Sequence, residues 1–254
     1  MADEVIVEDR ASVRIITINR PEVRNAINRA TALALRDAME GLDERADLAV
    51  GILTGAGGGF SAGMDLKAFG RGEIPTLAPG GFGGFTENPP AKPLIAAVEG
   101  FALAGGFELV LACDLIVAAK DSRFGLPEAS RGLVAAAGGL LRLPQRLPRN
   151  IAMELALTAA PLGARRAFDL GLVNRLTEPA GALAGALELA DEIRVQAPLA
   201  LATSKRIIVE SCDWSTDEAF ERQRPLVDAI EGSADAREGA LAFVEKRSPN
   251  WTGR

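Results

Sequence analysis

The first part of the chain carries the apolar and polar alternation that is typical of β-strands. Residues 4–8 and 12–19 combine this alternation with β-branched side chains, so two strands are predicted there. Residues 28–46 predict a helix, because apolar residues recur there with helical spacing. The apolar stripe of that helix, at spacings of four, three and four, consists of Leu35, Met39, Leu42 and Ala46.

The middle of the chain repeats a strand, a helix and a strand. Largely apolar segments at 49–54, 93–98 and 114–119 predict buried strands. Residues 105–113 predict a helix that begins at a pair of glycines. Repeated strand and helix segments with apolar strands predict an α/β fold with covered sheets.

The last part of the chain has a different pattern. From about residue 180 it is helical, apart from breaks at Pro198, around Asp213 and near Ser233. We expect these helices to pack on the core or on a neighbouring subunit.

Residues 71–93 contain the run GGFGGF and several prolines, and they show no period. The stretch is too long for a simple turn. Two interpretations stay open at this point, a mobile surface loop or a lid over a pocket.

Length and charge limit the number of domains and the kinds of partner that we expect for this chain. The chain has 254 residues, and 28 Lys and Arg against 34 Asp and Glu give a net charge of −6. One large domain, alone or with a small appendage, fits this length. The acidic balance argues against nucleic acid as a partner. The acidic N-terminus does not resemble a signal peptide, and no long uncharged apolar run predicts a membrane span, so we expect a cytoplasmic protein.

The chain contains no histidine and no tyrosine. The lack of histidine excludes Ser-His-Asp and Cys-His catalysis and zinc sites that use histidine. Proton transfer then falls mainly to carboxyl groups. Cys113 and Cys212 form no CxxC motif, and we interpret them as two reduced, buried thiols, with a disulfide as the alternative.

A glycine-rich stretch follows the strand predicted at 49–54. Residues 59–63 match the G-x-S-x-G motif of serine hydrolases, but Ser61 has no histidine as its base and only Lys67 as a substitute. A dinucleotide-binding motif is incomplete, because Phe60 stands where its third glycine is needed. We interpret the glycines as allowing backbone N–H groups to point into a site.

Two carboxyl groups occur in apolar surroundings. Glu108 lies in the almost wholly apolar helix predicted at 105–113, and Glu128 follows Pro127. Each has a structural alternative: a polar helix face or an ion pair for Glu108, and a first-turn helix residue for Glu128. Together they could serve as acid and base, because two carboxyl groups in one apolar pocket titrate as a coupled pair. One ionised and one protonated carboxyl group suit the addition or removal of water across a double bond.

A set of short motifs in fixed order covers essentially the whole chain. They are Asn19-Arg20-Pro21, Asn25-Ala26, Phe60-Ser61-Ala62-Gly63-Met64-Asp65-Leu66, the stretch 97–109, Ala112-Cys113-Asp114, Phe124-Gly125-Leu126-Pro127-Glu128, Gly138-Gly139 and residues 242–247. In this order and spacing the chain resembles the enoyl-CoA hydratase/isomerase (crotonase) superfamily.

The resemblance implies an α/β fold of the crotonase-like (ClpP/crotonase) type, a ββα superhelix followed by C-terminal helices used in trimerisation. It implies a core over residues 1–190 that holds an acyl-CoA site. It also implies a helical region over 191–254 that serves oligomerisation and covers the site. The expected assembly is a homo-oligomer, a trimer or a dimer of trimers.

The resemblance also implies a reaction. The substrate would be an acyl-CoA thioester, whose enolate is held by the backbone N–H groups of Met64 and Gly105, with Glu108 and Glu128 holding water. Both acidic positions are filled, which favours hydration of a trans-2-enoyl-CoA to a 3-hydroxyacyl-CoA. No metal or redox cofactor is implied, since coenzyme A is part of the substrate. An enoyl-CoA Δ3-Δ2 isomerase, another acyl-CoA lyase, a non-catalytic acyl-CoA-binding protein and a Ser61 hydrolase stay as alternatives.

Further residues are expected to bind substrate or coenzyme A, with Phe243 and Lys246 reaching a neighbouring subunit. The set is Arg24, Ala26, Ala62, Asp65, Leu66, Lys67, Phe101, Gly106, Pro127, Leu133, Ala136, Phe243 and Lys246. The chain departs from the pattern of typical hydratases at one of these positions. Where they carry a glycine that approaches the water, this chain has Ala136, whose methyl group could reshape the water site or the acyl pocket.

Overall fold

The structure is a computed structural model and describes residues 3–254. Its main sheet has six strands in the order β1-β2-β3-β6-β8-β11, in which β1 and β2 are antiparallel and the other neighbours are parallel. The strands are β1 (Val5–Arg10), β2 (Val13–Ile18), β3 (Val50–Gly55), β6 (Leu94–Val98), β8 (Leu115–Ala119) and β11 (Arg175–Thr177). The predicted strands at 4–8, 12–19, 49–54, 93–98 and 114–119 are therefore confirmed.

A second, smaller sheet lies beside the first. It joins β7 (Phe101–Leu103), β9 (Arg123–Gly125) and β10 (Leu162–Gly163) in the order β10-β9-β7. These strands have two or three residues each, which is too short for a visible alternation, and sequence reasoning did not find them. The first of them leads directly into the N-terminus of α3 (Gly105–Ala112), the helix predicted at 105–113.

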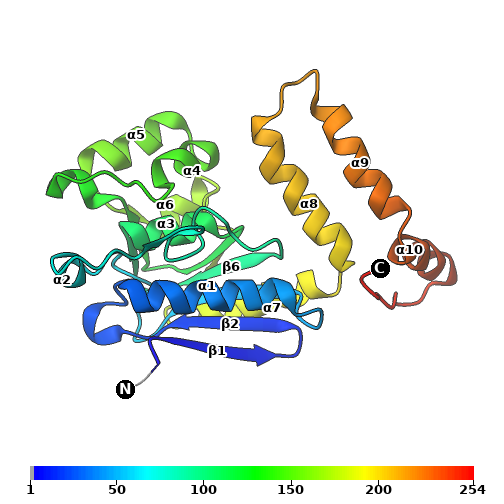
Figure 1. The fold of residues 1–254 in the computed structure, drawn as a ribbon, viewed down its shortest axis with the longest axis horizontal. Helices are drawn as coiled ribbons and strands as arrows, with labels where there is room; N and C mark the ends of the chain where they lie inside the picture. The colour runs from blue at the N-terminus through cyan, green and yellow to red at the C-terminus, as the bar shows by residue number, and fades with distance from the viewer. Residues whose placement is uncertain (1–2) are drawn as a thin grey trace.

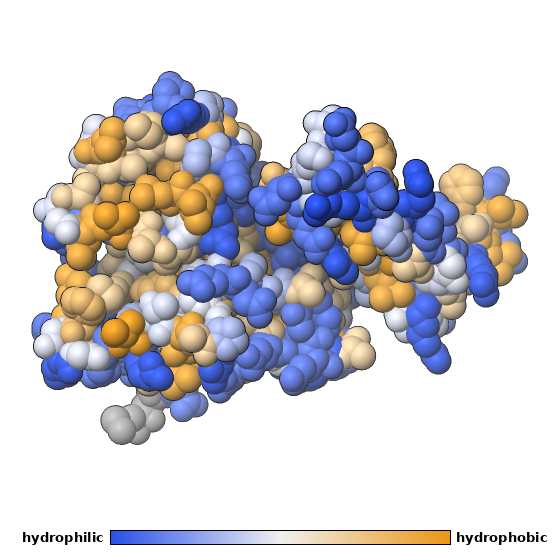
Figure 2. Space-filling model, turned by 45° about the horizontal axis from the view of Figure 1, so that its top comes forward, coloured by the Kyte–Doolittle hydropathy of each residue, from blue (hydrophilic) through white to orange (hydrophobic). Residues whose placement is uncertain are grey.

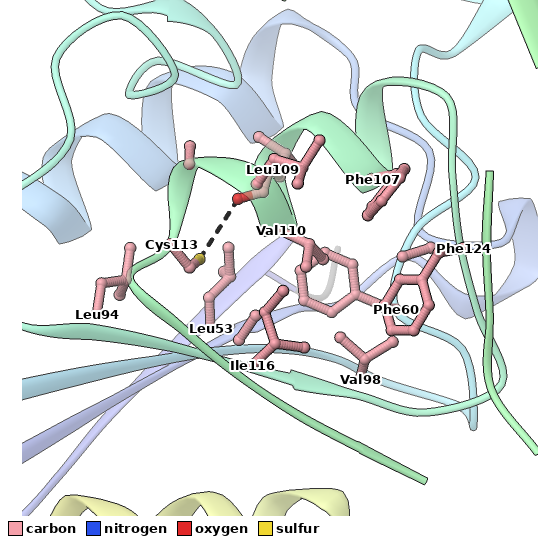
Figure 3. Close-up of a cluster of buried hydrophobic side chains, with 14 of the residues drawn as sticks. Leu53, Phe60, Leu94, Val98, Phe107, Leu109, Val110, Cys113, Ile116 and Phe124 are labelled. Carbon is pink, nitrogen blue, oxygen red and sulfur yellow. Dashed lines mark hydrogen bonds between the residues drawn. The ribbon is translucent and has the colours of Figure 1, made fainter. Parts of the chain in front are cut away.

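Alternate residues of the parallel strands face two different apolar layers, as the pleat of a strand requires. Ile52 and Ile95 face α7 (Ala182–Arg194), whereas Leu53 and Leu94 face the layer that contains α1 (Arg29–Glu44) and α3. Figure 3 shows this second layer, where α3 lies over the strands and Cys113 Sγ donates to the Leu109 carbonyl. Phe107 and Phe124 pack there with ring centroids 5.4 Å apart.

The remaining helices surround this core and extend from it. They are α2 (Leu66–Phe69), α4 (Gly139–Arg146), α5 (Arg149–Thr158), α6 (Ala164–Asp169), α8 (Pro198–Glu210), α9 (Ala219–Glu231) and α10 (Ala234–Glu245), with 3-10 turns η1 (Pro21–Val23), η2 (Pro127–Arg131) and η3 (Ser211–Asp213). Figure 1 shows α8, α9 and α10 as an arm that leaves the body carrying the sheets. The predicted helical C-terminus and its breaks are confirmed. The expected boundary at residue 190 falls inside α7, which packs on the sheet along its length.

Three expectations differ from the structure. Ala46 is exposed beyond the end of α1, because the helix stops at Glu44 and only the other three residues of its stripe are buried. Cys212 is exposed on the arm while Cys113 is buried, so the two thiols do not share an environment and neither forms a disulfide. Within 71–93, residues 80–86 are buried and form part of a short hairpin, β4 (Thr76–Leu77) with β5 (Gly81–Phe82), so the stretch is not simply a surface loop.

Across the described residues, no helix combines the length and apolar character needed to span a membrane.

Candidate active site

A cavity of about 490 Å³ is lined by residues of α2, α3, η2 and the segment before α4. Ten of the residues predicted from the sequence line it: Arg24, Ala62, Met64, Leu66, Gly105, Glu108, Pro127, Glu128, Leu133 and Ala136. Its walls are mostly apolar, and both predicted acidic side chains are among them. A mostly apolar cavity with a few converging polar groups is the usual form of a small-molecule site.

Seven predicted residues lie outside the cavity wall. Ala26, Asp65, Lys67, Phe101, Gly106, Phe243 and Lys246 belong to this set. Asp65 has a structural role, because its carboxylate caps α2 at the N–H groups of Lys67 and Ala68 and pairs with Arg20 at 3.1 Å. The Lys67 side chain itself is exposed.

Four of the other five predicted residues outside the cavity wall have separate explanations. Gly106 lies against the backbone of Ser61, where a β-carbon would not fit, and the Phe101 ring packs against Gly59. Phe243 is 86% exposed on α10, and Lys246 follows at the end of that helix. Figure 1 shows α10 at the end of the arm, away from α2, α3 and α4. One chain alone does not test the expected intersubunit role of Phe243 and Lys246, which stays a prediction.

Sequence reasoning missed eight wall residues. They are Thr76, Phe82, Glu87, Leu103, Ala104, Arg131, Val134 and Ala137. Three of them come from the stretch 71–93, whose lack of period gave no signal. Ala104, Val134 and Ala137 each adjoin a predicted residue, and Leu103 and Arg131 lie two positions from one, so extending each prediction by two positions would have found these five.

The Glu108 carboxyl group is held by the backbone. Glu108 points from the first turn of α3, is 3% exposed, and accepts hydrogen bonds at Oε1 from the N–H groups of Ala137 (2.7 Å) and Gly139 (2.9 Å). Its Oε2 has no hydrogen-bond partner among residues 3–254. Burial raises the pKa of Glu108 to about 7, the Gly139 N–H opposes this, and the neighbouring charge of Glu128 adds to the rise.

Glu128 faces the same cavity from η2. It is 9% exposed, and its Oε2 is buried without a hydrogen-bond partner in the described chain. Burial raises the pKa of Glu128, while its own backbone N–H and the charge of Arg131 oppose the rise. An unpartnered buried carboxyl oxygen is costly, so it needs a compensating reason, and an incoming water or ligand supplies one.

The backbone N–H groups of Met64 and Gly105 are both without an acceptor in the described residues. Ile27 and Met64 form an isolated parallel bridge, in which Ile27 N–H donates to Gly63 and Ile27 carbonyl accepts from Asp65. That pairing leaves the Met64 N–H free. Gly105 is the first residue of α3, so its N–H has no partner within the helix.

Gly63 brings the two N–H groups together. It has φ +90°, and a β-carbon there would lie 2.8 Å from the Gly105 nitrogen. The next residue in the chain is Met64. Ala104, just before Gly105, also adopts an unusual backbone with φ 53° and ψ −131°. A non-glycine residue in such a conformation costs on the order of 1–3 kcal/mol, and strain of this kind concentrates at functional sites.

Ser61 supports this loop from beneath. Its hydroxyl donates to the Asn25 carbonyl at 2.8 Å and accepts from the Gly63 N–H at 3.1 Å, and the side chain is fully buried. Lys67, its only candidate base, is exposed and not on the cavity wall. The hydroxyl therefore has a structural role, and nothing in this geometry supports the hydrolase alternative.

Comparisons with known proteins show which proteins this chain is similar to. The sequence model of the enoyl-CoA hydratase/isomerase family matches residues 8–254. A carnitinyl-CoA dehydratase of Shigella flexneri is 42% identical over 262 residues, covering 100% of both chains. Crystal structures of enoyl-CoA hydratases from Mycobacterium tuberculosis H37Rv and Mycobacterium marinum share 58% and 60% identity, each with a TM-score of 0.98 and 100% coverage of both chains.

Proposed function

The chain belongs to the enoyl-CoA hydratase/isomerase family, and we propose that it adds water reversibly to a trans-2-enoyl-CoA to give a 3-hydroxyacyl-CoA. It has the crotonase fold and is an enzyme of the carbon–oxygen lyase type. One observation carries the finer proposal. Two carboxyl groups with raised pKa values and two unpaired backbone N–H groups line a single, mostly apolar cavity.

The unpaired N–H groups of Met64 and Gly105 would bind the thioester oxygen. Attack at C3 turns the thioester into an enolate, so negative charge develops on that oxygen. Donors that are fixed before the reaction stabilise such charge, and loss of one donor costs about 3–4 kcal/mol in comparable enzymes. The partial positive charge at the N-terminus of α3 acts in the same direction.

Glu108 and Glu128 would handle the protons. The carboxylate of the pair accepts a proton from water as the water oxygen bonds to C3, and the carboxylic acid of the pair gives its proton to C2 of the enolate. Dehydration reverses both steps. Because the two groups share a cavity and the charge of Glu128 adds to the rise in the pKa of Glu108, we expect the pair to retain one proton over a range of pH. The proposed steps require neither a metal ion nor a redox cofactor.

The acyl-CoA substrate also needs cationic contacts and cover for its acyl chain. Arg24 lies on the cavity wall and is proposed to contact coenzyme A. Apolar side chains are exposed on the arm, including Ile208, Phe220 and Phe243, and others on α4 and α5, including Leu141 and Leu157. Figure 2 shows hydrophobic surface both on the body and at the far end of the arm. We propose that these areas pair in a homo-oligomer, a trimer or a dimer of trimers.

The direct test uses the purified protein with crotonyl-CoA. Wild-type protein should remove the enoyl absorbance and form 3-hydroxybutyryl-CoA, identified by chromatography. Glu108→Gln and Glu128→Gln should each lower kcat by roughly 10²–10⁴-fold, the range for loss of a general acid or base. Glu40→Gln, an exposed change on α1, is the control and should retain activity.

The same variants separate hydration from isomerisation. An isomerase moves a proton between C2 and C4 of a 3-enoyl-CoA and can use a single carboxyl group. Conversion of a 3-enoyl-CoA that survives Glu128→Gln but is lost in Glu108→Gln, with no hydration of crotonyl-CoA by the wild type, would replace the hydratase proposal. Binding of acyl-CoA without any turnover would instead favour a non-catalytic protein.

A further inference from the structure

Arg142 lies beside the site but outside the cavity wall, and no step proposed so far uses it. It is half-buried on α4, one turn after the Gly138-Gly139 pair. Its Nη2 donates to the Thr86 carbonyl at 2.5 Å. Thr86 adjoins Glu87, which lines the cavity, so the contact ties α4 to the wall formed by the stretch 71–93.

The guanidinium of Arg142 also packs on the turn that holds Glu108. Gly138 has φ +98°, and the Arg142 guanidinium occupies the space that a β-carbon at Gly138 would take. The residues on either side of Gly138 are Ala137 and Gly139, whose N–H groups donate to Glu108 Oε1. Arg142 thus packs directly against the centre of the three-residue segment that fixes the carboxyl group.

We propose that Arg142 is a positioning residue for the acid–base pair: it joins the turn at 137–139 to the cavity wall at Thr86 and places a fixed positive charge near Glu108. This rests on the proposed function for its role in catalysis, although the contacts themselves do not. Arginine suits the task, because its planar group can donate to Thr86 while it packs over a glycine, and it stays charged at any working pH.

The electrostatic effect has a definite sign. The charge of Arg142 opposes the rise that burial causes in the pKa of Glu108, and Glu108 in turn favours the charged form of Arg142. The other charged or titratable groups that act on these two side chains are Glu128 from η2, Arg146 from α4, Cys113 after α3 and Glu87 from the wall. Removing the Arg142 charge makes Glu108 hold its proton more tightly.

The test compares Arg142→Gln, Arg142→Lys and Arg146→Gln. Arg146 is the matched control, since it is one turn further along α4, is also half-buried, and donates to the Cys113 carbonyl instead of contacting the 137–139 turn. The first measurement is a ¹³C NMR titration of the Glu108 carboxyl group in the ligand-free enzyme, assigned with Glu108→Gln. The second is the pH dependence of kcat and KM for crotonyl-CoA.

For Arg142→Gln we expect the Glu108 titration midpoint to rise, as for loss of a nearby opposite charge. Its kcat should fall about tenfold with little change in KM, because the effect is on proton transfer. Arg142→Lys should keep the titration midpoint near the wild-type value, and Arg146→Gln should leave it unchanged.

An unchanged Glu108 midpoint in Arg142→Gln, with only a lower melting temperature, would overturn the inference. An equal rise in Arg146→Gln would do so too. Failure of the proposed function is a separate result: the wild type would then not hydrate acyl-CoA, while the NMR titration would still report on Arg142.

Discussion

Glu108 Oε1 accepts a hydrogen bond from the N–H of Gly139, the first residue of α4, at 2.9 Å. The contact joins two residues that are distant in the sequence, and Glu128, on η2, lies between them along the chain. Both carboxyl groups line one cavity and are buried, and burial raises both pKa values, whereas the Gly139 N–H opposes the rise at Glu108.

The first prediction concerns stability at different pH. In the folded chain the pKa of Glu108 is raised from 4.5 to about 7, so the folded state binds more protons than the unfolded state between these values. The free energy of unfolding should therefore fall as the pH rises from about 4.5 to 7, by about 3 kcal/mol for a shift of this size.

Glu108→Gln removes this titration. At pH 8 the variant should be more stable than the wild type, and the difference should shrink toward pH 5. Urea unfolding at both pH values measures this, with Glu40→Gln as the exposed control. A variant that is less stable than the wild type at pH 8 would contradict the prediction.

The second prediction concerns the pH dependence of activity. The proposed step needs one ionised and one protonated carboxyl group, so kcat/KM should be bell-shaped and both limbs should belong to the pair. The alkaline limb should have an apparent pKa of about 7, because burial raises the pKa of Glu108 to about 7. Initial rates with crotonyl-CoA at constant ionic strength test this. A rate that is independent of pH from 5 to 9 would rule out the pair as the proton carriers.

The third prediction concerns Gly63. A β-carbon at this position would lie 2.8 Å from the Gly105 nitrogen, so Gly63→Ala must displace one of the two proposed oxyanion donors. We expect kcat to fall by roughly 10²–10³-fold, the effect of losing one such donor. Gly58→Ala is the matched control, because Gly58 also has a positive φ of +78° but has nothing within 4 Å of its β-carbon position. Equal losses in both variants would indicate backbone strain and not a displaced donor.

The fourth prediction concerns Ala136. Ala136 is exposed and lines the cavity, at the position where the resemblance to the family predicts a glycine. Ala136→Val should lower kcat/KM for longer or branched enoyl-CoA substrates more than for crotonyl-CoA, by about 10-fold or more for each added carbon that clashes. Ala136→Gly should shift the preference in the opposite direction. Identical ratios across a panel of acyl-CoA substrates would show that Ala136 does not contact the acyl group.

Patterns within the sequence were sufficient for the long elements. The strands and helices with a clear period, such as 12–19 and 28–46, appear at the predicted places because burial of one face specifies them locally. The short strands β7, β9 and β10 and the buried hairpin within 71–93 carried no such signal. Their conformation depends on neighbours far along the chain, as in the pairing of Phe101 with Arg123.

The amino-acid composition limits the chemistry available to this protein. With no histidine, proton transfer falls to carboxyl groups, and Glu108 and Glu128 are the ones in apolar sequence surroundings. The folded structure is needed to see that the two side chains share a cavity and that Arg142 packs on the turn holding Glu108. It is also needed to see that the N–H groups of Met64 and Gly105 have no acceptor among residues 3–254. The physical reason is that residue type limits which reactions are available, whereas pKa values and free hydrogen-bond donors depend on burial and pairing between segments distant in sequence.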